Sequence, residues 1–244
     1  GTYYYYGRVV GNMGVVQLTA SSTNVVVNAR PGATLVSGAG TFCSTATLTA
    51  TGPCGGTQDF GTGTSTTTVS PVYSWWNYSR TCSLILRNEV TCNPGPITHL
   101  AVYVGTAGTH AFTGIQIRLK KTTETTAPTT FPGNGTLVWS GNYTFSTTGW
   151  VTFDITDFDW NSDNLLIEWQ HGFTTYTSNY PYFRYTTTAT NLQTYAYSDS
   201  GLPTSGTNTT SRPNYRLTFA ASPTVYWQNT TSNGTSTATP STSQ

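Results

Sequence analysis

The sequence contains very few charged side chains. Its 244 residues include 10 basic and 9 acidic ones, 8% of the chain, where globular proteins average about a quarter. With a formal net charge of +1 and no basic run, the chain offers nothing that could follow a phosphate backbone, so we expect no nucleic-acid partner. It also lacks an apolar run of the roughly 18–20 residues that cross a bilayer as a helix, so we expect no membrane insertion.

Helical periodicity of useful length is missing as well. Short runs of β-branched and aromatic residues are separated by Gly, Pro, Asn and Thr clusters, which predicts an all-β protein. Strands are predicted at residues 97–104, 114–120, 136–140, 150–155, 164–171, 182–186, 192–198 and 215–219. Their spacing favours one jelly-roll-like β-sandwich over residues 57–220. Alternation in Ile115-x-Ile117-x-Leu119 and in Leu166-x-Glu168-x-Gln170 predicts one buried face for each sheet.

The sequence offers no arrangement typical of a catalytic site. The three histidines lie in no nucleophile motif, and His99 and His171 fall in predicted strands, where a packed, hydrogen-bonded side chain is usual. Glycoside hydrolysis needs two carboxylates together, and only one Asp cluster brings acidic residues close along the chain. We therefore expect no enzymatic activity.

That cluster contains Asp157, Asp159, Asn161 and Asp163, which alternate as the oxygen ligands of a calcium loop do. Serine stands where such a loop requires glycine. The favoured interpretation is a turn at residues 161–164 that joins two strands, because Asn and Asp bond their own backbone in turns. A Ca²⁺ ion near Asp157, Asp159 and Asp163 is the less favoured alternative, and no cofactor is predicted.

The four cysteines form two close pairs along the chain, Cys43/Cys54 and Cys82/Cys92. Neither pair has the spacing of a zinc site, and four cysteines allow three connectivities. Two local disulfides are the preferred interpretation, which would place the chain in an oxidising, extracellular space. Four buried thiols are the alternative.

Aromatic side chains make up 14% of the sequence, and several fall in or near predicted loops. Rings at such positions can stack on the apolar faces of sugars. The candidates for glycan binding are Trp75, Trp76 and Tyr78, with Tyr176, Tyr180 and Tyr182 nearby. In the alternative interpretation the loop tyrosines make subunit contacts, and four other tryptophans fill the sandwich: Trp139, Trp150, Trp160 and Trp169. Six arginines are interpreted as partners of acids or backbone carbonyls: Arg80, Arg87, Arg118, Arg184, Arg212 and Arg216.

The segments flanking the predicted sandwich contain motifs in a distinctive order. They are GTYYYY at 1–6, NVVVN at 24–28, TLTATG at 47–52, VYWQ at 225–228 and GTSTATPSTSQ at 234–244. These motifs resemble Ig-like repeats of very large secreted surface proteins of Bacteroidota, in a rotated order. The closing strands come first (1–28), the opening strands next (29–56) and the middle strands last (221–244).

The intervening residues resemble a surface module of the same class of proteins. The motifs are PVYSWWNYSR at 71–80, GPITHL at 95–100, TGW at 148–150, WNSDNLLIE at 160–168, YAYSDSG at 195–201 and RPNYR at 212–216. The resemblance implies that this module is inserted into a split Ig-like domain. It supplies no catalytic residues.

The rotated order implies that residues 1–28 of one copy complete the Ig-like domain of a neighbouring copy by strand complementation, giving a head-to-tail array. In the alternative, the termini meet within one chain. Candidate donor residues are Tyr3, Tyr5, Val9, Val25 and Val27. Candidate acceptors are Leu48, Tyr226 and Trp227. The leading hypothesis is a structural subunit or repeat of an extracellular fibre whose partners are identical copies. The alternative is a secreted carbohydrate-binding module whose partners are surface glycans.

Overall fold

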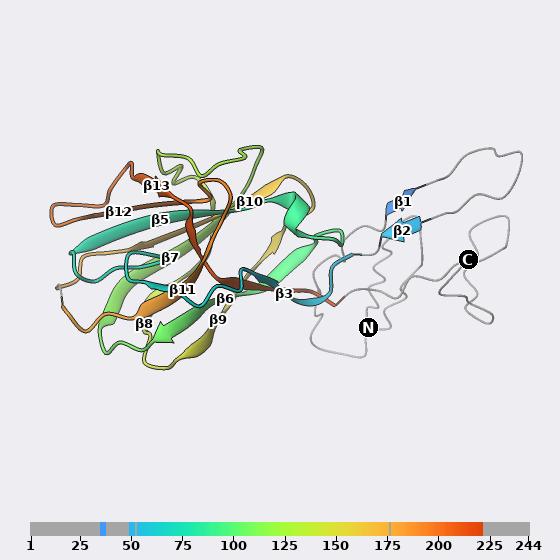
Figure 1. The fold of residues 1–244 in the computed structure, drawn as a ribbon. Helices are drawn as coiled ribbons and strands as arrows, with labels where there is room; N and C mark the ends of the chain where they lie inside the picture. The colour runs from blue at the N-terminus through green and yellow to red at the C-terminus, as the bar shows by residue number, and fades with distance from the viewer. Residues whose placement is uncertain (1–34, 38–48, 52, 176, 222–244) are drawn as a thin grey trace, which may run out of the picture.

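The computed structural model describes residues 35–37, 49–51, 53–175 and 177–221, and is drawn in Figure 1. Strands β1 (Leu35–Ser37) and β2 (Thr49–Thr51) pair antiparallel, within the predicted opening strands at 29–56. The remaining described elements form an all-β sandwich of two antiparallel sheets. Several predicted residues lie outside the described ones: Tyr3, Tyr5, Val9, Val25, Val27, Cys43, Leu48, Tyr176, Tyr226 and Trp227.

Eight strands of the sandwich follow the jelly-roll order. One sheet contains β3 (Gly56–Phe60), β15 (Tyr215–Phe219), β6 (Pro96–Thr106) and β9 (Gly149–Asp159), in that order. The other contains β5 (Tyr78–Ile85), β10 (Asn164–His171), β7 (Ala111–Thr122) and β8 (Thr136–Thr144). Numbered along the chain, the sheets run 1-8-3-6 and 2-7-4-5, the connectivity of two Greek keys. The jelly-roll-like prediction is confirmed.

Four further strands lie between β10 and β15 in the chain: β11 (Tyr182–Thr187), β12 (Gln193–Ser198), β13 (Thr207–Thr209) and β14 (Ser211–Pro213). Strand β12 extends the second sheet beyond β5, and β13 pairs with β12. Strand β11 pairs with β6, with β14 and with the short β4 (Thr66–Thr67). All eight predicted strands exist. However, β3 and β5, which complete the jelly roll, were not predicted, and two of the predicted strands, β11 and β12, are additions to it.

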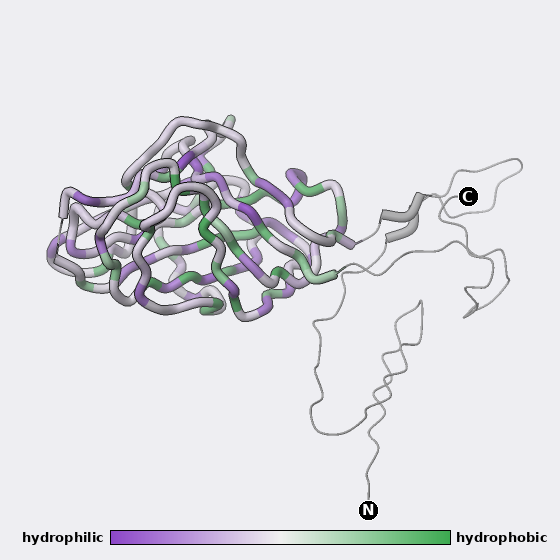
Figure 2. Tube along the Cα trace, turned by 90° about the horizontal axis from the view of Figure 1, so that it is seen from below, coloured by the Kyte–Doolittle hydropathy of each residue, from purple (hydrophilic) through white to green (hydrophobic). Residues whose placement is uncertain are grey.

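The core lies between the two sheets, and hydrophobic residues alternate with hydrophilic ones along the strands (Figure 2). Ile115, Ile117 and Leu119 are fully buried, as their alternation predicts. Strand β10 differs, because it is buried on both faces. Trp169 lies in the main core, whereas Leu166 packs on the opposite face in a second cluster with Phe131. The prediction of one buried face per sheet is wrong here, because the segment before β8 covers the outer face of β5 and β10.

The disulfide joins Cys54 to Cys92, so the predicted local pairing is wrong. Cys82 is a free thiol, fully buried in the middle of β5. Burial raises the pKa of this thiol well above its usual range. Cys54 pairs with Cys92 because the backbone brings the two together. Pro53 and Asn93 form a β-bridge, and the Cys54 N–H donates to the Asn93 carbonyl at 2.7 Å, which places Cys54 beside Cys92.

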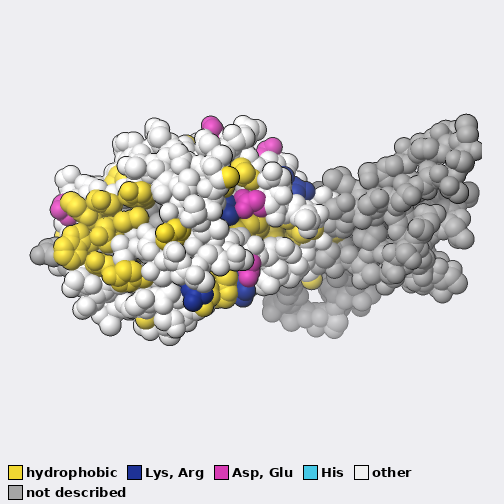
Figure 3. Space-filling view, in the orientation of Figure 1, with side chains coloured by type: hydrophobic (Ala, Val, Ile, Leu, Met, Phe, Trp, Pro, Cys, Tyr) yellow, Lys and Arg dark blue, Asp and Glu magenta, His cyan; other side chains and the backbone are white. Residues whose placement is uncertain are grey.

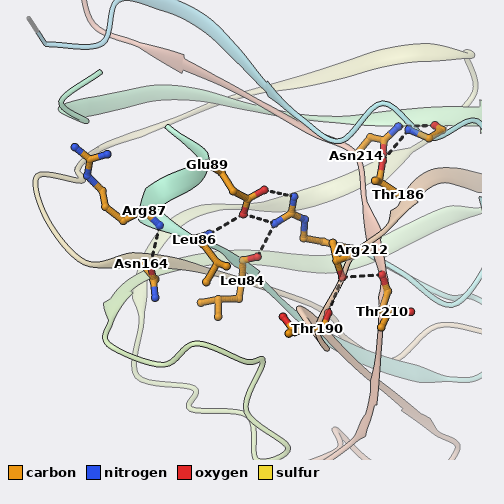
Figure 4. Close-up of polar contacts among 12 residues, drawn as sticks. Leu84, Leu86, Arg87, Glu89, Asn164, Thr186, Thr190, Thr210, Arg212 and Asn214 are labelled. Carbon is orange, nitrogen blue, oxygen red and sulfur yellow. Dashed lines mark hydrogen bonds and ion pairs between the residues drawn. The ribbon is translucent and has the colours of Figure 1, made fainter. Parts of the chain in front are cut away.

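An ion pair between a buried arginine and a partly exposed glutamate ties the end of β5 to β14. The guanidinium of Arg212, whose side chain is 2% exposed, donates to both carboxylate oxygens of Glu89 at 2.7 Å and to the Leu84 carbonyl at 2.9 Å (Figure 4). Glu89 belongs to the short 3-10 helix η1 (Arg87–Glu89). Burial alone would raise the pKa of Glu89, but the hydrogen bonds and positive charge of Arg212 lower it overall.

Candidate functional site

The chain enters and leaves the sandwich at the same end, and the other end is remote from both connections. At one end, which we call the base, the first and last strands meet: Gly56 of β3 pairs with Phe219 of β15. Strand β6 runs from the base, where Ile97 also pairs with Phe219, to the opposite end, where Thr106 pairs with Tyr182. Its 11 residues span roughly 33 Å at 3.3 Å per residue. The connections to the flanking segments therefore lie far from the second end.

Aromatic side chains gather at that second end. They come from the segment before β5, the start of β5, the segment between β10 and β11, the start of β11 and the end of β12. We call them the aromatic tip: Tyr73, Trp75, Trp76, Tyr78, Phe173, Tyr180, Tyr182, Tyr195 and Tyr197. Segments that are distant in sequence thus place their aromatic rings at the same end of the sandwich.

Seven rings of the tip form a connected series, and the other two, Tyr78 and Phe173, contact each other at 5.9 Å. Trp76 stacks on Tyr197 with ring centroids 4.9 Å apart and planes 23° apart. Tyr73 contacts Tyr197 and Tyr180 edge-on, at 5.5 and 5.4 Å. Tyr180 in turn lies 5.7 Å from Tyr182. These separations are those of favourable aromatic pairs, so the rings hold one another in place.

The tip is also where the apolar surface is exposed. Among the described residues, five large hydrophobic side chains are exposed, and four belong to the tip: Trp75 (44%), Phe173 (60%), Tyr182 (38%) and Tyr197 (39%). Figure 3 shows hydrophobic side chains gathered at the left end of the view, where charged side chains are sparse. A concentrated apolar surface of this kind is typical of a binding site.

Backbone contacts fix the segment before β5 that carries three of the tip rings. The Tyr73 N–H donates to Ser79 Oγ at 3.0 Å, and the hydroxyl of Thr81 donates to the Pro71 carbonyl at 2.8 Å. The Asn77 N–H donates to Asp199 Oδ1 at 3.3 Å. The aromatic platform is therefore preorganised, which lowers the entropic cost of binding a ligand.

His171 supports the same segment from beneath. It is fully buried at the end of β10, with Nε2 2.9 Å from the Tyr73 carbonyl and Nδ1 2.8 Å from the Gly172 carbonyl. A neutral imidazole has one N–H and donates to only one of these two oxygens. Burial lowers the pKa of His171, although both carbonyls oppose that shift. The prediction that His171 is a packed, hydrogen-bonded side chain is confirmed.

A shallow, open depression of about 400 Å³ lies next to Phe173. Its lining combines apolar surface with the uncharged polar groups of His110, Thr113, Thr174 and Thr175. His110 Nε2 lies 2.9 Å from Thr174 Oγ1, and burial lowers the pKa of His110, with a further lowering by His171. Hydroxyl and imidazole groups beside an exposed ring can hydrogen-bond a polar ligand whose apolar face rests on the ring.

The arginines are engaged as predicted, with one exception. Arg80 pairs with Glu168 at 2.8 Å, Arg212 with Glu89, and Arg216 with Asp59. Arg87 and Arg118 donate to backbone carbonyls, of Val90 and Gly135. The guanidinium of Arg184 has no hydrogen-bond acceptor within the described part of the chain. It lies instead over the ring of Tyr103, 4.3 Å from the ring centroid.

The structure places the three predicted glycan-binding residues in different ring contacts. Trp75 contacts Tyr180, which contacts Tyr182; Trp76 stacks on Tyr197; and Tyr78 contacts Phe173. Sequence reasoning missed four members of the tip: Tyr73, Phe173, Tyr195 and Tyr197. The spacing of the last two was a usable signal, because residues two apart on a strand share a face, and these rings stack at 6.2 Å.

The other tryptophans mostly fill the sandwich, as the alternative interpretation held. Trp160 and Trp169 are fully buried, and Trp139 packs against the core. Trp150 does not. It lies on the outer face of the first sheet, beneath the guanidinium of Arg216 at 4.4 Å and edge-on to Tyr103 at 5.2 Å.

The Asp cluster forms the predicted turn between β9 and β10. Asp163 adopts φ of 61°, a conformation that Asp tolerates in tight turns. Asn161 accepts a hydrogen bond from Lys121 Nζ at 3.0 Å and donates one to Asp159 at 3.0 Å. Over the described ranges, no three His, Cys, Asp or Glu side chains come close enough together to hold a metal ion.

Comparison of the chain with protein-family models, with curated proteins and with solved structures finds no match. Within the described part of the chain, no helix has the length and apolar character needed to span a bilayer. The Cys54–Cys92 disulfide is compatible with an extracellular location.

Proposed function

We propose that the sandwich is an extracellular carbohydrate-binding module and that the aromatic tip is its binding site. The observation that carries this proposal is the concentration of exposed rings at the end remote from the base. Sugars present apolar C–H faces, which stack on Trp and Tyr rings and bury a large area. Trp76 and Tyr197 stack on each other, and Tyr197 is exposed, so this pair offers aromatic area to a ligand.

Two further features support a sugar ligand over an apolar one. The depression beside Phe173 is lined by hydroxyl groups and an imidazole, which suit the many hydroxyls of a sugar. The platform segment is held by hydrogen bonds before any ligand arrives. A rigid aromatic surface with polar neighbours discriminates by shape and by hydrogen bonding.

A glycan array probed with the full chain tests the proposal. We expect saturable binding of a defined set of glycans, and Trp75→Ala should weaken it by roughly 10–100-fold, the cost of losing one aromatic contact surface. Leu137→Ala is the matched control, because Leu137 is 41% exposed on β8, outside the tip. Binding that survives Trp75→Ala, or an array without hits, contradicts the proposal.

As a second function we propose the structural role in a head-to-tail fibre. It is favoured by the pairing of Gly56 with Phe219, because a domain inserted into another must begin and end at neighbouring positions. In such a fibre the base would face the assembly and the aromatic tip would point outward. Both functions could then belong to one subunit.

Electron microscopy of the full chain and of a chain lacking residues 1–28 tests the fibre. We expect the full chain to polymerise, and the shortened chain to remain unpolymerised and to bind a peptide of residues 1–28. Fibres formed by the shortened chain would contradict strand donation. This outcome is independent of glycan binding, so the two proposals are separately testable.

A further inference from the structure

We infer that the glycan bound at the aromatic tip is acidic, and that Arg184 binds its anionic group, a carboxylate or a sulfate. This inference rests on the proposed function and names the ligand class for the same site. Arg184 lies on β11, two residues after Tyr182 of the tip.

Arg184 differs from the other arginines of the sandwich. Arg80, Arg212 and Arg216 each have a carboxylate partner, and Arg87 and Arg118 each donate to a backbone carbonyl. Each of these five guanidinium groups therefore has at least one acceptor within the chain, although the buried Nε atoms of Arg80 and Arg212 have none. Arg184 is the exception within the described residues, and its neighbours are uncharged: Thr66 opposite it on β4, Tyr103 beneath it and Asn214 beside it.

The ring of Tyr103 holds the guanidinium of Arg184 by a cation–π contact. With the guanidinium carbon 4.3 Å from the ring centroid, the group lies over the ring, so its N–H donors are left at its edges. The guanidinium edge is a planar fork that matches two oxygens of a carboxylate or sulfate. A neutral hydroxyl uses only one of those donors, so this geometry favours an oxyanion.

Arg184 is continuous with the tip. Phe183 is fully buried, whereas Tyr182 is exposed and the guanidinium of Arg184 lies over Tyr103. Both flanking side chains therefore lie outside the core, with their Cα atoms roughly 7 Å apart along the strand, although the pairing of β11 with β6 shifts register between Tyr182 and Phe183. Tyr182 is 38% exposed and lies 5.7 Å from Tyr180. The roughly 7 Å between Tyr182 and Arg184 along β11 is comparable to the width of one sugar ring. A sugar resting on Tyr182 would therefore carry its acidic substituent within reach of Arg184.

The test compares charged and neutral ligands on matched variants. The full chain, Arg184→Gln and Arg184→Lys are applied to an array that contains neutral, carboxylated and sulfated glycans. The best acidic ligand is then titrated beside the same chain after carboxyl reduction or desulfation. Lys121→Gln is the control, because it makes the same change of net charge at a lysine bonded to Asn161 in the turn after β9.

We expect the acidic ligand to bind at least about tenfold more tightly than its neutral form, since a charge-assisted hydrogen bond is worth that much. Arg184→Gln should abolish this preference, and Arg184→Lys should retain only part of it because Lys lacks the fork. Neutral ligands should bind all variants alike, and Lys121→Gln should behave as the original chain.

The outcomes separate this inference from the function on which it rests. If glycans bind but acidic ones have no advantage, or if the advantage survives Arg184→Gln, the role of Arg184 is refuted and glycan binding stands. If no glycan binds at all, both are refuted. Melting temperatures of the variants verify that each is folded under the assay conditions.

Discussion

The base and the aromatic tip of the sandwich are built from different interactions. Near the base, the Cys54–Cys92 disulfide and the ion pair of the buried Arg212 with Glu89 join distant segments. At the tip, aromatic rings pack on one another, hydrogen bonds hold the segment before β5, and four of the rings are exposed. Covalent and buried ionic contacts stabilise a fold without offering a surface to a ligand. Exposed rings contribute less to the fold and leave area for binding, so the two ends separate stability from recognition.

The largest expected effect is at the base. Glu89→Gln leaves the buried Arg212 guanidinium without its counter-charge, which should lower the free energy of unfolding by about 3–5 kcal/mol. Thermal unfolding measures the loss, with Asp59→Asn as control. That variant breaks the more exposed Arg216–Asp59 pair and should cost at most about 1 kcal/mol. Equal losses in the two variants would show that burial of the Arg212–Glu89 pair does not matter.

Removal of the disulfide should come next. Cys54→Ser opens a link across 38 residues and should cost about 2–4 kcal/mol, while glycan affinity of the folded protein stays unchanged. Denaturant titration with and without reductant measures this cost. In Cys82→Ala, which keeps the disulfide, reductant should still lower stability. A Cys54→Ser chain that is as stable as the original, or that loses glycan binding while folded, would break the separation of the two ends.

A tip variant should show the reverse pattern. Tyr197→Ala removes the ring that contacts both Trp76 and Tyr73, so glycan affinity should fall by roughly tenfold or more. Stability should fall by only about 1 kcal/mol, because the ring is 39% exposed. Calorimetric titration and thermal unfolding of one preparation give both values. A loss of more than about 3 kcal/mol in stability would make the tip a structural element.

The smallest expected effect is a dependence on pH. Burial lowers the pKa values of His171 and His110, so the folded state favours their neutral forms. Their contribution to stability is complete above about pH 6.5, the ordinary histidine value, and decreases as the pH falls below it. Melting temperature measured from pH 7.5 to 5.0 should decline, and the decline should be smaller in His171→Gln. Identical slopes in the two proteins would contradict the role of His171.

The sequence predicted the sandwich but not all of its strands. Alternation in β7 carried a clear signal, because Ile115, Ile117 and Leu119 face the core. Strand β5 was missed, since its polar residues are buried by tertiary contacts: Ser83 bonds Gln193 and Tyr215, and Arg80 bonds Glu168. No local pattern reveals partners that lie more than 80 residues away.

The candidate site was predictable only where its residues are adjacent in sequence. Adjacent rings such as Trp75 and Trp76 are visible along the chain, whereas the meeting of β12 with the segment before β5 depends on sheet order. The predicted disulfides were wrong because they paired cysteines that are close in sequence. The fold instead brings Cys54 beside Cys92, 38 residues away. Cys82 looked like a partner, yet β5 buries it away from both.

Ligand binding at the aromatic tip can be observed directly at its tryptophans. The most direct measurement is titration of the array-selected glycan into the ¹⁵N-labelled full chain while the indole N–H signals are followed. We predict that the signals of Trp75 and Trp76 shift in a saturable way, while those of the buried Trp160 and Trp169 stay fixed. Shifts confined to Trp150, on the outer face of the first sheet, or no shift at Trp75 and Trp76, would contradict the claim.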